Sequence, residues 1–292
     1  MAILGLGLVG GSVARALRAR EGARRGPRSW IAAWSPSHAG PQAARRDGVI
    51  DVAADTPQAA LHDAELVLLA APVPACLAML DELAGSWASA LARDTVITDV
   101  ASTKEALVLR ATALGLRFVG GHPMAGRETS GYPASSDDLF VDRPWVVVPS
   151  ADEPAVARVE ALAAAVGARP IRMSAAAHDR AVAGISHLPL IASAALVEAV
   201  AGSPGSPHEG WDEARAVTST GWRDTTRLAR GEVEMGAGIV TTNAPALALR
   251  VRDLVTALEA WADELERPGG PDRDAITGRL ARARAMLEAT GG

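Results

Sequence analysis

The sequence predicts an α/β fold for the first part of the chain and an all-helical second part. Short apolar runs alternate with helical patterns up to about residue 172, which is typical of a parallel sheet covered by helices. Beyond Ser174 the strand signals stop and long Ala-rich helical patterns follow. We therefore expect two domains, residues 1–172 and 173–292, with the boundary near residue 172.

The expected elements follow from hydrophobic periodicity. Strands are predicted at short apolar runs, at residues 3–4, 30–34, 66–70, 96–99, 117–119, 145–148 and 170–173. Helices are predicted where apolar residues recur every three or four positions, at residues 11–20, 154–166, 175–200, 245–267 and 272–290. The helix at 175–200 is so apolar that most of its sides need cover, which favours a homodimer formed mainly by the second domain.

The stretch AILGLGLVGGS, residues 2–12, lies between the first strand and the first helix. Its glycines Gly5, Gly7 and Gly10 have the spacing G-x-G-x-x-G of a dinucleotide-binding turn. Gly5 allows a tight turn, Gly7 allows close approach of a pyrophosphate, and Gly10 allows the helix to pack on the strand. The sequence therefore predicts a Rossmann-type dinucleotide-binding domain. The alternative is an ordinary turn before a surface helix.

The residue after the second strand distinguishes the two nicotinamide dinucleotides. An Asp or Glu there accepts hydrogen bonds from the ribose of NAD, but Ser35 occupies the position. Ser35, Ser37 and His38 offer hydrogen bonds to a 2′-phosphate, and Arg45 or Arg46 offers positive charge. This pattern favours NADP over NAD. The alternative is that the two arginines lie on an exposed helix face.

Composition excludes several classes of protein. The net charge of −5 gives no basic footprint for nucleic acid or an anionic membrane surface. A single cysteine, Cys76, cannot form an internal disulfide and suits a reducing compartment. No signal peptide and no uninterrupted apolar run of membrane-spanning length is evident, so we expect a cytoplasmic protein without a membrane partner. We assign no metal ligands.

Three loops follow strands of the expected parallel sheet, where ligands bind in such folds. They read LLAAPVPA (68–75), TDVASTKE (98–105) and VGGHPMAGRETSG (119–131). His122 is the best candidate for a base, because glycines and a proline shape the backbone around a group that titrates near neutral pH. Ser102 orients that imidazole or caps a helix beginning at Thr103, and both roles can hold at once. Lys104, the one lysine in the chain, either meets the cofactor or carboxylates of the fold, or is an exposed helix lysine.

Five motifs in family order resemble prephenate and arogenate dehydrogenases of tyrosine biosynthesis. They are GLGLVGGS (5–12), DVASTK (99–104), GGHPMAGRETSG (120–131), HDRAVAGISHLP (178–189) and GWRDTTRLA (221–229). The resemblance covers nearly the whole chain. It implies an NAD(P)-dependent oxidoreductase that transfers a hydride from a cyclohexadienol while the ring loses carbon dioxide.

The resemblance also implies roles for individual residues. His122 takes the proton of the ring hydroxyl as the hydride leaves, and Ser102 supports His122. Arg227 binds a carboxylate of the substrate, with Asp224 in the same loop, and Glu128 gates the site. His187 matches a further active-site histidine, or is a buried residue that ties the long helix to the nucleotide domain. The expected cofactor contacts are Gly5, Gly7, Leu8, Gly10, Ser35, Ser37, Ala71, Pro72 and Lys104.

Leu190 departs from the family pattern, in which many members have a second histidine associated with the substrate side chain. The expected substrate is prephenate, with arogenate and 4-amino-4-deoxyprephenate as alternatives. A β-hydroxyacid dehydrogenase is disfavoured because no lysine follows residue 104, and an imine reductase shares the two-domain architecture. The alternative of another class is a non-catalytic NAD(P) sensor, which would need the glycines but not His122, Ser102 and Arg227 together.

Overall fold

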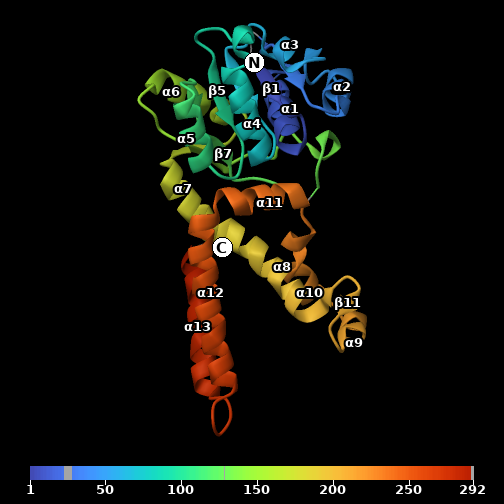
Figure 1. Ribbon diagram of the computed structural model, residues 1–292, viewed down its shortest axis with the longest axis vertical. Helices are drawn as coiled ribbons and strands as arrows, with labels where there is room; N and C mark the ends of the chain where they lie inside the picture. Colours follow the sequence, from blue (N-terminus) through green and yellow to red (C-terminus); the bar gives the residue numbers. More distant parts are fainter. Residues whose placement is uncertain (23–27, 128, 291–292) are drawn as a thin grey trace. The chain divides into compact units, whose positions relative to one another are not determined.

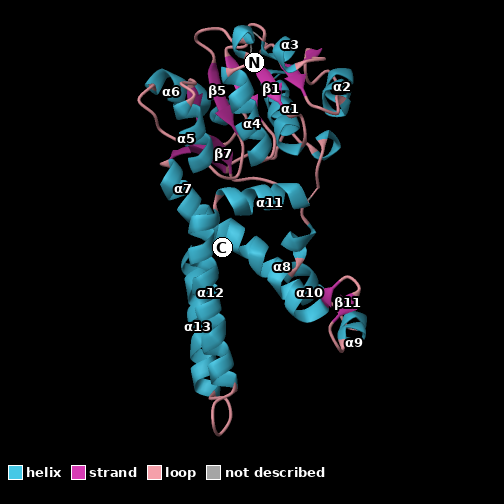
Figure 2. Ribbon diagram, in the orientation of Figure 1, coloured by secondary structure: helices cyan, strands magenta, loops and turns pink. Residues whose placement is uncertain are grey.

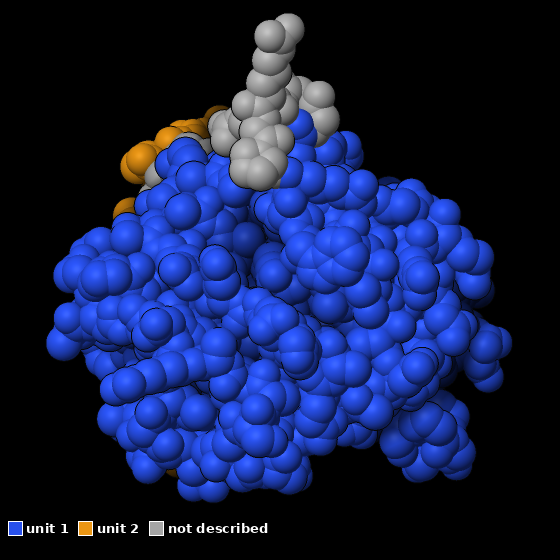
Figure 3. Space-filling view, turned by 90° about the horizontal axis from the view of Figure 1, so that it is seen from above, with its two compact units in different colours: residues 1–244 blue, residues 245–292 orange. Residues whose placement is uncertain are grey.

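A computed structural model describes residues 1–22, 28–127 and 129–290 of the chain. The chain divides into two compact units, residues 1–244 and 245–292, which Figure 3 shows in different colours. The first unit contains both the sheets and the helices up to residue 244. The domain boundary near residue 172 stays a prediction.

The principal sheet is parallel throughout its described residues. Its strand order is β3-β2-β1-β4-β5-β6, so the order reverses between β1 and β4. Such a reversal opens a crevice at the carboxyl ends of the strands, where dinucleotides bind. The strands are β1 (Ala2–Leu4), β2 (Ala32–Trp34), β3 (Val52–Ala53), β4 (Leu66–Leu69), β5 (Val96–Asp99) and β6 (Phe118–Val119).

Helices cover both faces of this sheet, as Figures 1 and 2 show. Successive strand residues point to opposite faces. Ile3 accordingly belongs to the core on one face, with α1 and α6, and Leu4 to the core on the other face, with α3, α4 and α5. The helices are α1 (Leu8–Gly22), α2 (Ala39–Arg46), α3 (Pro57–Leu61), α4 (Val73–Ala84), α5 (Glu105–Ala113) and α6 (Glu153–Ala165), with short 3₁₀ turns at Ala88–Ala90 and Tyr132–Ala134.

A second sheet begins where the chain leaves β6. It has the order β7-β8-β9, with β7 (Gly121–Pro123) antiparallel to β8 (Pro144–Val147) and β8 parallel to β9 (Arg169–Arg172). The sequence predicts the bounds of β8 and β9 to within one residue, but the expectation of a single parallel sheet is wrong for them. β7 was missed because His122 and Pro123 lack the apolar signal of a strand.

Gly121 begins β7 where the chain passes from the first sheet to the second, and the close approach to β5 there requires a residue without a side chain. A Cβ atom there would lie 2.6 Å from the backbone oxygen of Asp99. The backbone N–H of Gly121 donates to Asp99 Oδ1 at 2.9 Å, and its carbonyl accepts from Lys104 Nζ at 2.8 Å. Asp99 and Lys104 also form an ion pair in which both side chains are fully buried. This pair joins the start of β7 to the end of β5.

Helices fill the rest of the first unit, apart from a short hairpin formed by β10 (Gly202–Ser203) and β11 (Ser206–Pro207). The predicted helix at 175–200 is observed, with a π-helical turn at Ala183–His187 between α7 (Ala175–Val182) and α8 (Leu188–Ala201). π-helical turns occur frequently at functional sites. The sequence did not predict α9 (Trp211–Ala216), α10 (Thr220–Thr225), the 3₁₀ turn Arg227–Arg230 or α11 (Val233–Thr242).

The helix formed by Ala175–Ala201 is the one in the described part of the chain that is long and apolar enough to cross a membrane, by length and composition alone. Several of its apolar side chains are exposed in the single chain, among them Ile185, which is 72% exposed. Its polar residues His178, Asp179 and His187 are instead buried. The exposed apolar side chains fit the expectation of a surface covered by another copy, which stays a prediction.

The second unit contains most of α12 (Ala244–Leu265) and all of α13 (Arg273–Thr290), close to the predicted helices at 245–267 and 272–290. The two helices lie side by side. Arg279 donates hydrogen bonds to the backbone oxygens of Ala257 and Ala260, and its guanidinium lies 4.1 Å from the centre of the Trp261 ring. These contacts join α13 to α12.

The Gly-rich turn before α1 is tightly packed at two of its three glycines. A Cβ at Gly10 would lie 2.3 Å from the backbone oxygen of Gly5, and one at Gly5, whose φ is 99°, would lie 2.3 Å from that of Ala70. A Cβ at Gly7 would meet nothing within 4 Å. The turn is therefore packed against the β4 end on one side and open at Gly7.

We predict that Gly10→Ala lowers the free energy of unfolding by about 1–3 kcal/mol, because backbone has to move to admit the methyl group. Urea unfolding followed by circular dichroism measures the change. Gly7→Ala is the matched control, since its methyl group enters open space, and its stability should stay within about 0.5 kcal/mol of the parent. Equal stability losses in the two variants would contradict the packing described.

We predict that Lys104→Met lowers the free energy of unfolding by about 3–5 kcal/mol, because it leaves the buried Asp99 carboxylate without its cation. Arg110→Met, in the helix α5 that follows Lys104, is the control, since Arg110 pairs with Asp81 at the surface and such pairs contribute about 0–1 kcal/mol. Urea denaturation of both variants is the measurement. A Lys104→Met variant as stable as Arg110→Met would show that the buried pair does not stabilise the fold.

Candidate active site

The dinucleotide cradle lies at the switch point between β1 and β4. Gly5, Gly7 and Leu8 lead into the first turn of α1, and Ala71 and Pro72 lie between β4 and α4. Backbone N–H groups at a helix start bind anions. The open space at Gly7 gives a pyrophosphate room to approach this backbone. The residues present therefore fit a nicotinamide dinucleotide.

Ser35 has a structural contact that the sequence did not reveal. It is buried, and its hydroxyl oxygen accepts a hydrogen bond from the backbone N–H of Leu6 at 2.7 Å, which braces the Gly-rich turn. Ser37 and His38 lie in the turn before α2. Arg45 and Arg46 are in the last turn of α2, about 10 Å along the helix from that turn. Their expected contact with a 2′-phosphate is therefore not favoured by their position.

His122 lies in the middle of β7, and its ring contacts that of His178. Nδ1 of His122 is 2.8 Å from Nε2 of His178, and the two rings meet edge to face with centroids 5.0 Å apart. Burial lowers the pKa of His122 well below its usual value, and the positive charge of Lys104 and the neighbouring histidines lower it further. His122 is therefore neutral at neutral pH and suited to accept a proton.

Asp179 orients His178 from the other side. Asp179 Oδ1 is 2.7 Å from His178 Nδ1, and both residues are buried. The carboxylate also accepts the backbone N–H groups of Lys104 at 2.8 Å and Glu105 at 2.9 Å. Burial raises the pKa of Asp179, but hydrogen bonds from His178 and from these two N–H groups outweigh it, so the pKa is lowered. Asp179 is therefore an ionised acceptor at neutral pH.

Ser102 is partly buried in the loop between β5 and α5. The alternative that it caps the following helix is wrong, because α5 begins at Glu105 and Asp179 accepts the N–H groups at its start. The partner of His122 Nδ1 is His178. Support of His122 by Ser102 stays a prediction.

Lys104 is fully buried, so the alternative of an exposed helix lysine is wrong. Its ammonium group contacts Asp99 and the carbonyl of Gly121, beneath the strand that carries His122. Burial raises the pKa of Asp99, while Lys104 and two backbone N–H groups oppose that shift. The structure shows Lys104 in a supporting position, and its contact with the cofactor stays a prediction.

His187 lies in the π-helical turn and is 1% exposed. The side-chain amide nitrogen of Asn243 donates to the backbone oxygen of Asp179 at 2.8 Å and lies 3.1 Å from His187 Nδ1. Among the described residues, Nε2 of His187 has no hydrogen-bond partner. Burial lowers the pKa of His187 to about 4, although Asp179 opposes the shift. A neutral His187 with Nδ1 as acceptor leaves its Nε2–H to a ligand.

The expected carboxylate-binding residues lie in a separate segment. Asp224 is in α10 and Arg227 begins the 3₁₀ turn that follows, and both are exposed. Ser193 of α8 accepts the backbone N–H of Ala229 at 3.0 Å, which joins this turn to α8. Leu190 faces α11, since its Cδ2 lies 3.7 Å from where a Cβ of Gly236 would be. Glu128 lies outside the described residues.

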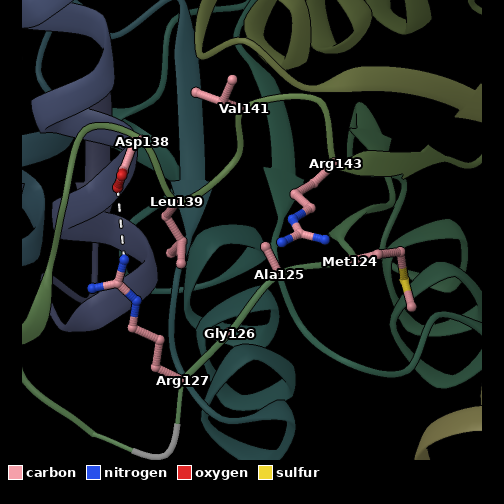
Figure 4. Close-up of a pocket in the computed structure, with 8 residues that line it drawn as sticks. All are labelled: Met124, Ala125, Gly126, Arg127, Asp138, Leu139, Val141 and Arg143. Atoms are coloured by element: carbon pink, nitrogen blue, oxygen red, sulfur yellow. Dashed lines mark ion pairs between the residues drawn. The ribbon is translucent and has the colours of Figure 1, made fainter. Parts of the chain in front are cut away.

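An open cavity of about 430 Å³ lies beside the chain that follows His122. Figure 4 shows Arg127 and Asp138 facing each other across it as an ion pair of 3.6 Å, and Arg143 entering from the other side. Its lining residues are Met124, Ala125, Gly126, Arg127, Asp138, Leu139, Val141 and Arg143. The motif that contains His122 therefore continues into a polar cavity.

Sequence reasoning missed His178, Asp179 and Asn243 as site residues. His178 and Asp179 stand at the start of the motif HDRAVAGISHLP, so the signal was present as a neighbouring histidine and carboxylate. Asn243 ends α11 and carries no motif. The fold brings these residues to His122 and His187.

Two family models match the chain. The nucleotide-binding domain of prephenate dehydrogenase matches residues 13–172, and the dimerization domain of prephenate dehydrogenase matches residues 174–274. Prephenate dehydrogenase of Bacillus subtilis is 34% identical over 246 residues, which are 82% of this chain and 63% of that enzyme. Cyclohexadienyl dehydrogenase of Zymomonas mobilis is 33% identical over 251 residues, which are 85% of this chain and 82% of that enzyme.

Solved structures similar to this chain include dehydrogenases of the same kind. Prephenate dehydrogenase from A. aeolicus, in complex with hydroxyphenyl propionate and NAD+, has a TM-score of 0.85 and 25% identity, and the match covers 99% of this chain and 97% of that chain. Synechocystis arogenate dehydrogenase has a TM-score of 0.75 and 28% identity over the same shares of the two chains. With both family models matched in order along one chain, this protein belongs to the prephenate dehydrogenase family of nicotinamide-dependent oxidoreductases.

Proposed function

We propose that this chain is a prephenate dehydrogenase, which converts prephenate to 4-hydroxyphenylpyruvate in tyrosine biosynthesis. The observation that carries the proposal is the neutral His122, held by His178 at the carboxyl edge of a dinucleotide-binding sheet. Family membership supplies the reaction class. When bound, the oxidised nicotinamide accepts a hydride from the ring carbon that bears the hydroxyl group.

His122 acts as the general base in this proposal. Nε2 takes the proton of the ring hydroxyl, and the emerging carbonyl becomes a phenolate as the ring loses its carboxylate as carbon dioxide. The phenolate then takes a proton, from the protonated His122 or from water, to give the phenol. The chain supplies positioning and one proton acceptor, which are the two things that an aromatising oxidation requires. Ser102, in the loop after β5, supports His122 from the cofactor side.

Arg227 binds a carboxylate of the substrate in this proposal, because a guanidinium forms a planar two-pronged contact with such a group. Asp224 contributes to substrate binding from the same segment, and Glu128 gates the site, as the family resemblance implies. His187 donates from Nε2 to the substrate, which gives this buried and unpartnered atom an acceptor. The cofactor contacts are Gly5, Gly7, Leu8, Gly10, Ser37, Ala71 and Pro72.

Arogenate is the second candidate substrate. The apolar Leu190 occupies the position of the histidine that many family members associate with the substrate side chain. Similarity to both a cyclohexadienyl dehydrogenase and an arogenate dehydrogenase supports the same alternative.

NADP is the preferred cofactor in this proposal. The residue after β2 is Ser35 rather than a carboxylate that would repel a 2′-phosphate, and Ser37 is exposed in the turn that leads into α2. The start of α2 adds backbone N–H groups that favour an anion. The complexed A. aeolicus structure holds NAD+, so NAD is the alternative.

The active form is a cytoplasmic homodimer in this proposal, with a nucleotide-binding domain of residues 1–172 and a dimerisation domain of residues 173–292. The match to a dimerization-domain model supports the assembly. Exposed apolar side chains on the helix of Ala175–Ala201 offer the surface that a second copy would cover.

We predict turnover of prephenate with NADP at a higher kcat/KM than with NAD, and a lower kcat/KM for arogenate. Initial rates of nicotinamide reduction with each of the four pairs measure this. His122→Asn should abolish turnover and leave the Kd for the dinucleotide unchanged, because the side chain acts on the substrate. Binding of the dinucleotide without turnover of any pair by the parent protein would favour a sensor instead.

We predict that kcat/KM stays high below pH 6.5 and falls only as the pH drops through the lowered pKa of His122. The base works in its neutral form, and a lowered pKa extends the range of that form to more acidic pH. Rates measured from pH 4.5 to 9, with circular dichroism to confirm folding at each pH, test this. An acid limb with its midpoint at or above pH 6.5 would exclude His122 with this pKa as the essential base.

A further inference from the structure

The side chains of Asp179, His178 and His122 form a hydrogen-bonded series that ends at the ionised carboxylate of Asp179. A carboxylate only accepts hydrogen bonds, so the 2.7 Å contact requires that Nδ1 of His178 carries the proton. In a neutral imidazole the other nitrogen is then an acceptor. Nε2 of His178 therefore accepts from His122, and Nδ1 of His122, 2.8 Å away, carries the proton. Nε2 of His122 is therefore unprotonated.

We infer that His178 is a positioning residue that fixes His122 in the Nδ1–H tautomer and so leaves Nε2 free to accept the substrate proton. The inference rests on the proposed function for its consequence in catalysis. Its structural part, the tautomer, does not depend on which substrate the protein uses.

The contact between the two histidines depends on the tertiary structure, because they lie on different elements of the fold. His122 lies in β7, and His178 lies in α7, 56 positions later. Asp179 joins α7 to the start of α5 through the N–H groups of Lys104 and Glu105, so α7 cannot rotate without breaking these bonds. The acceptor nitrogen of His178 is thereby aimed at β7.

The same hydrogen-bonded series stabilises the positive charge that forms on His122 during the reaction. After Nε2 of His122 takes a proton, the imidazolium still donates from Nδ1 to His178, which in turn donates to Asp179. The positive charge is thus connected to a buried carboxylate through two hydrogen bonds. This offsets the unfavourable effect of the nearby Lys104 ammonium group on a charged His122.

Two substitutions at residue 178 separate the effect of the His122 tautomer on kcat from the effect of side-chain packing. The amide of His178→Asn reaches the position of Nδ1, so it keeps the bond to Asp179 and loses the acceptor for His122. The amide oxygen of His178→Gln reaches the position of Nε2 and restores that acceptor. The expected result is a kcat about 100-fold or more lower for H178N and within about 10-fold of the parent for H178Q, with KM for the dinucleotide unchanged in both.

The tautomer is read directly by ¹⁵N–¹H correlation spectra of histidine rings at pH 7.5, with the His122 signals assigned by their loss in His122→Asn. The parent protein and H178Q should show a protonated Nδ1 and a bare Nε2, and H178N should show a mixture of tautomers. His62→Asn, at an exposed histidine whose side chain is 79% exposed, is the control and should leave activity and the His122 signals unchanged.

The inference is overturned if His122 carries its proton on Nε2 in the parent protein, or if H178N keeps the Nδ1–H tautomer. Equal losses of kcat in H178N and H178Q would also overturn it. Should H178N not fold, H178Q and the spectrum of the parent protein still decide the question. Failure of the proposed function looks different, because the parent protein would then show the expected tautomer and turn over none of the substrates.

Discussion

The buried ion pair between Asp99 and Lys104 is the interaction on which the rest of the site depends. Removing two charges from water costs several kcal/mol per ion, and only complete pairing offsets it. Here the Asp99 oxygens also accept the N–H groups of Gly121 and Ala101, and Lys104 also donates to the Gly121 carbonyl. The pair therefore satisfies its charges by binding the backbone of the residue before His122.

Asp179 is a second organising carboxylate, and it acts on three elements at once. Its side chain binds the start of α5 and the ring of His178, and its backbone oxygen accepts from Asn243. Asn243 in turn contacts His187. The orientations of three histidines, on β7, α7 and the π-helical turn, are thus linked to one residue. Because Asp179, His178, His187 and Asn243 are buried, a misplaced partner would leave a polar atom unsatisfied, which penalises alternative arrangements.

The nucleotide side of the crevice is organised by backbone rather than by charge. Gly5 and Gly10 allow contacts that a side chain would prevent, and Ser35 fixes the turn through Leu6. Ser35 thus braces the turn from the position at which many NAD-binding proteins have a carboxylate that binds the ribose. The turn before α1 packs against Ala70 at the end of β4, and the start of β7 is bound to Asp99 at the end of β5.

The local sequence pattern was enough to predict those features that depend on residues close together in the sequence. The glycine spacing, the long apolar helices and His122 between Gly121 and Pro123 were all predictable, because turns, periodicity and a histidine flanked by glycine and proline leave signals within a few residues. The five motifs likewise indicated the family, which the comparisons confirm. Strand limits were less predictable, and β7 was missed because it carries a site residue in place of an apolar run.

By itself, therefore, the sequence determined the fold class, the dinucleotide-binding turn, the family and the identity of the candidate base. Only the tertiary structure decided that Lys104 is buried, that Asp179 rather than Ser102 receives the start of α5, that Arg45 and Arg46 lie in the last turn of α2, at the other end from the turn before it, and that His178 contacts His122. These facts rest on contacts between elements distant in sequence. Hydrogen-bond partners and burial are set by how helices and strands pack, and no local pattern records them.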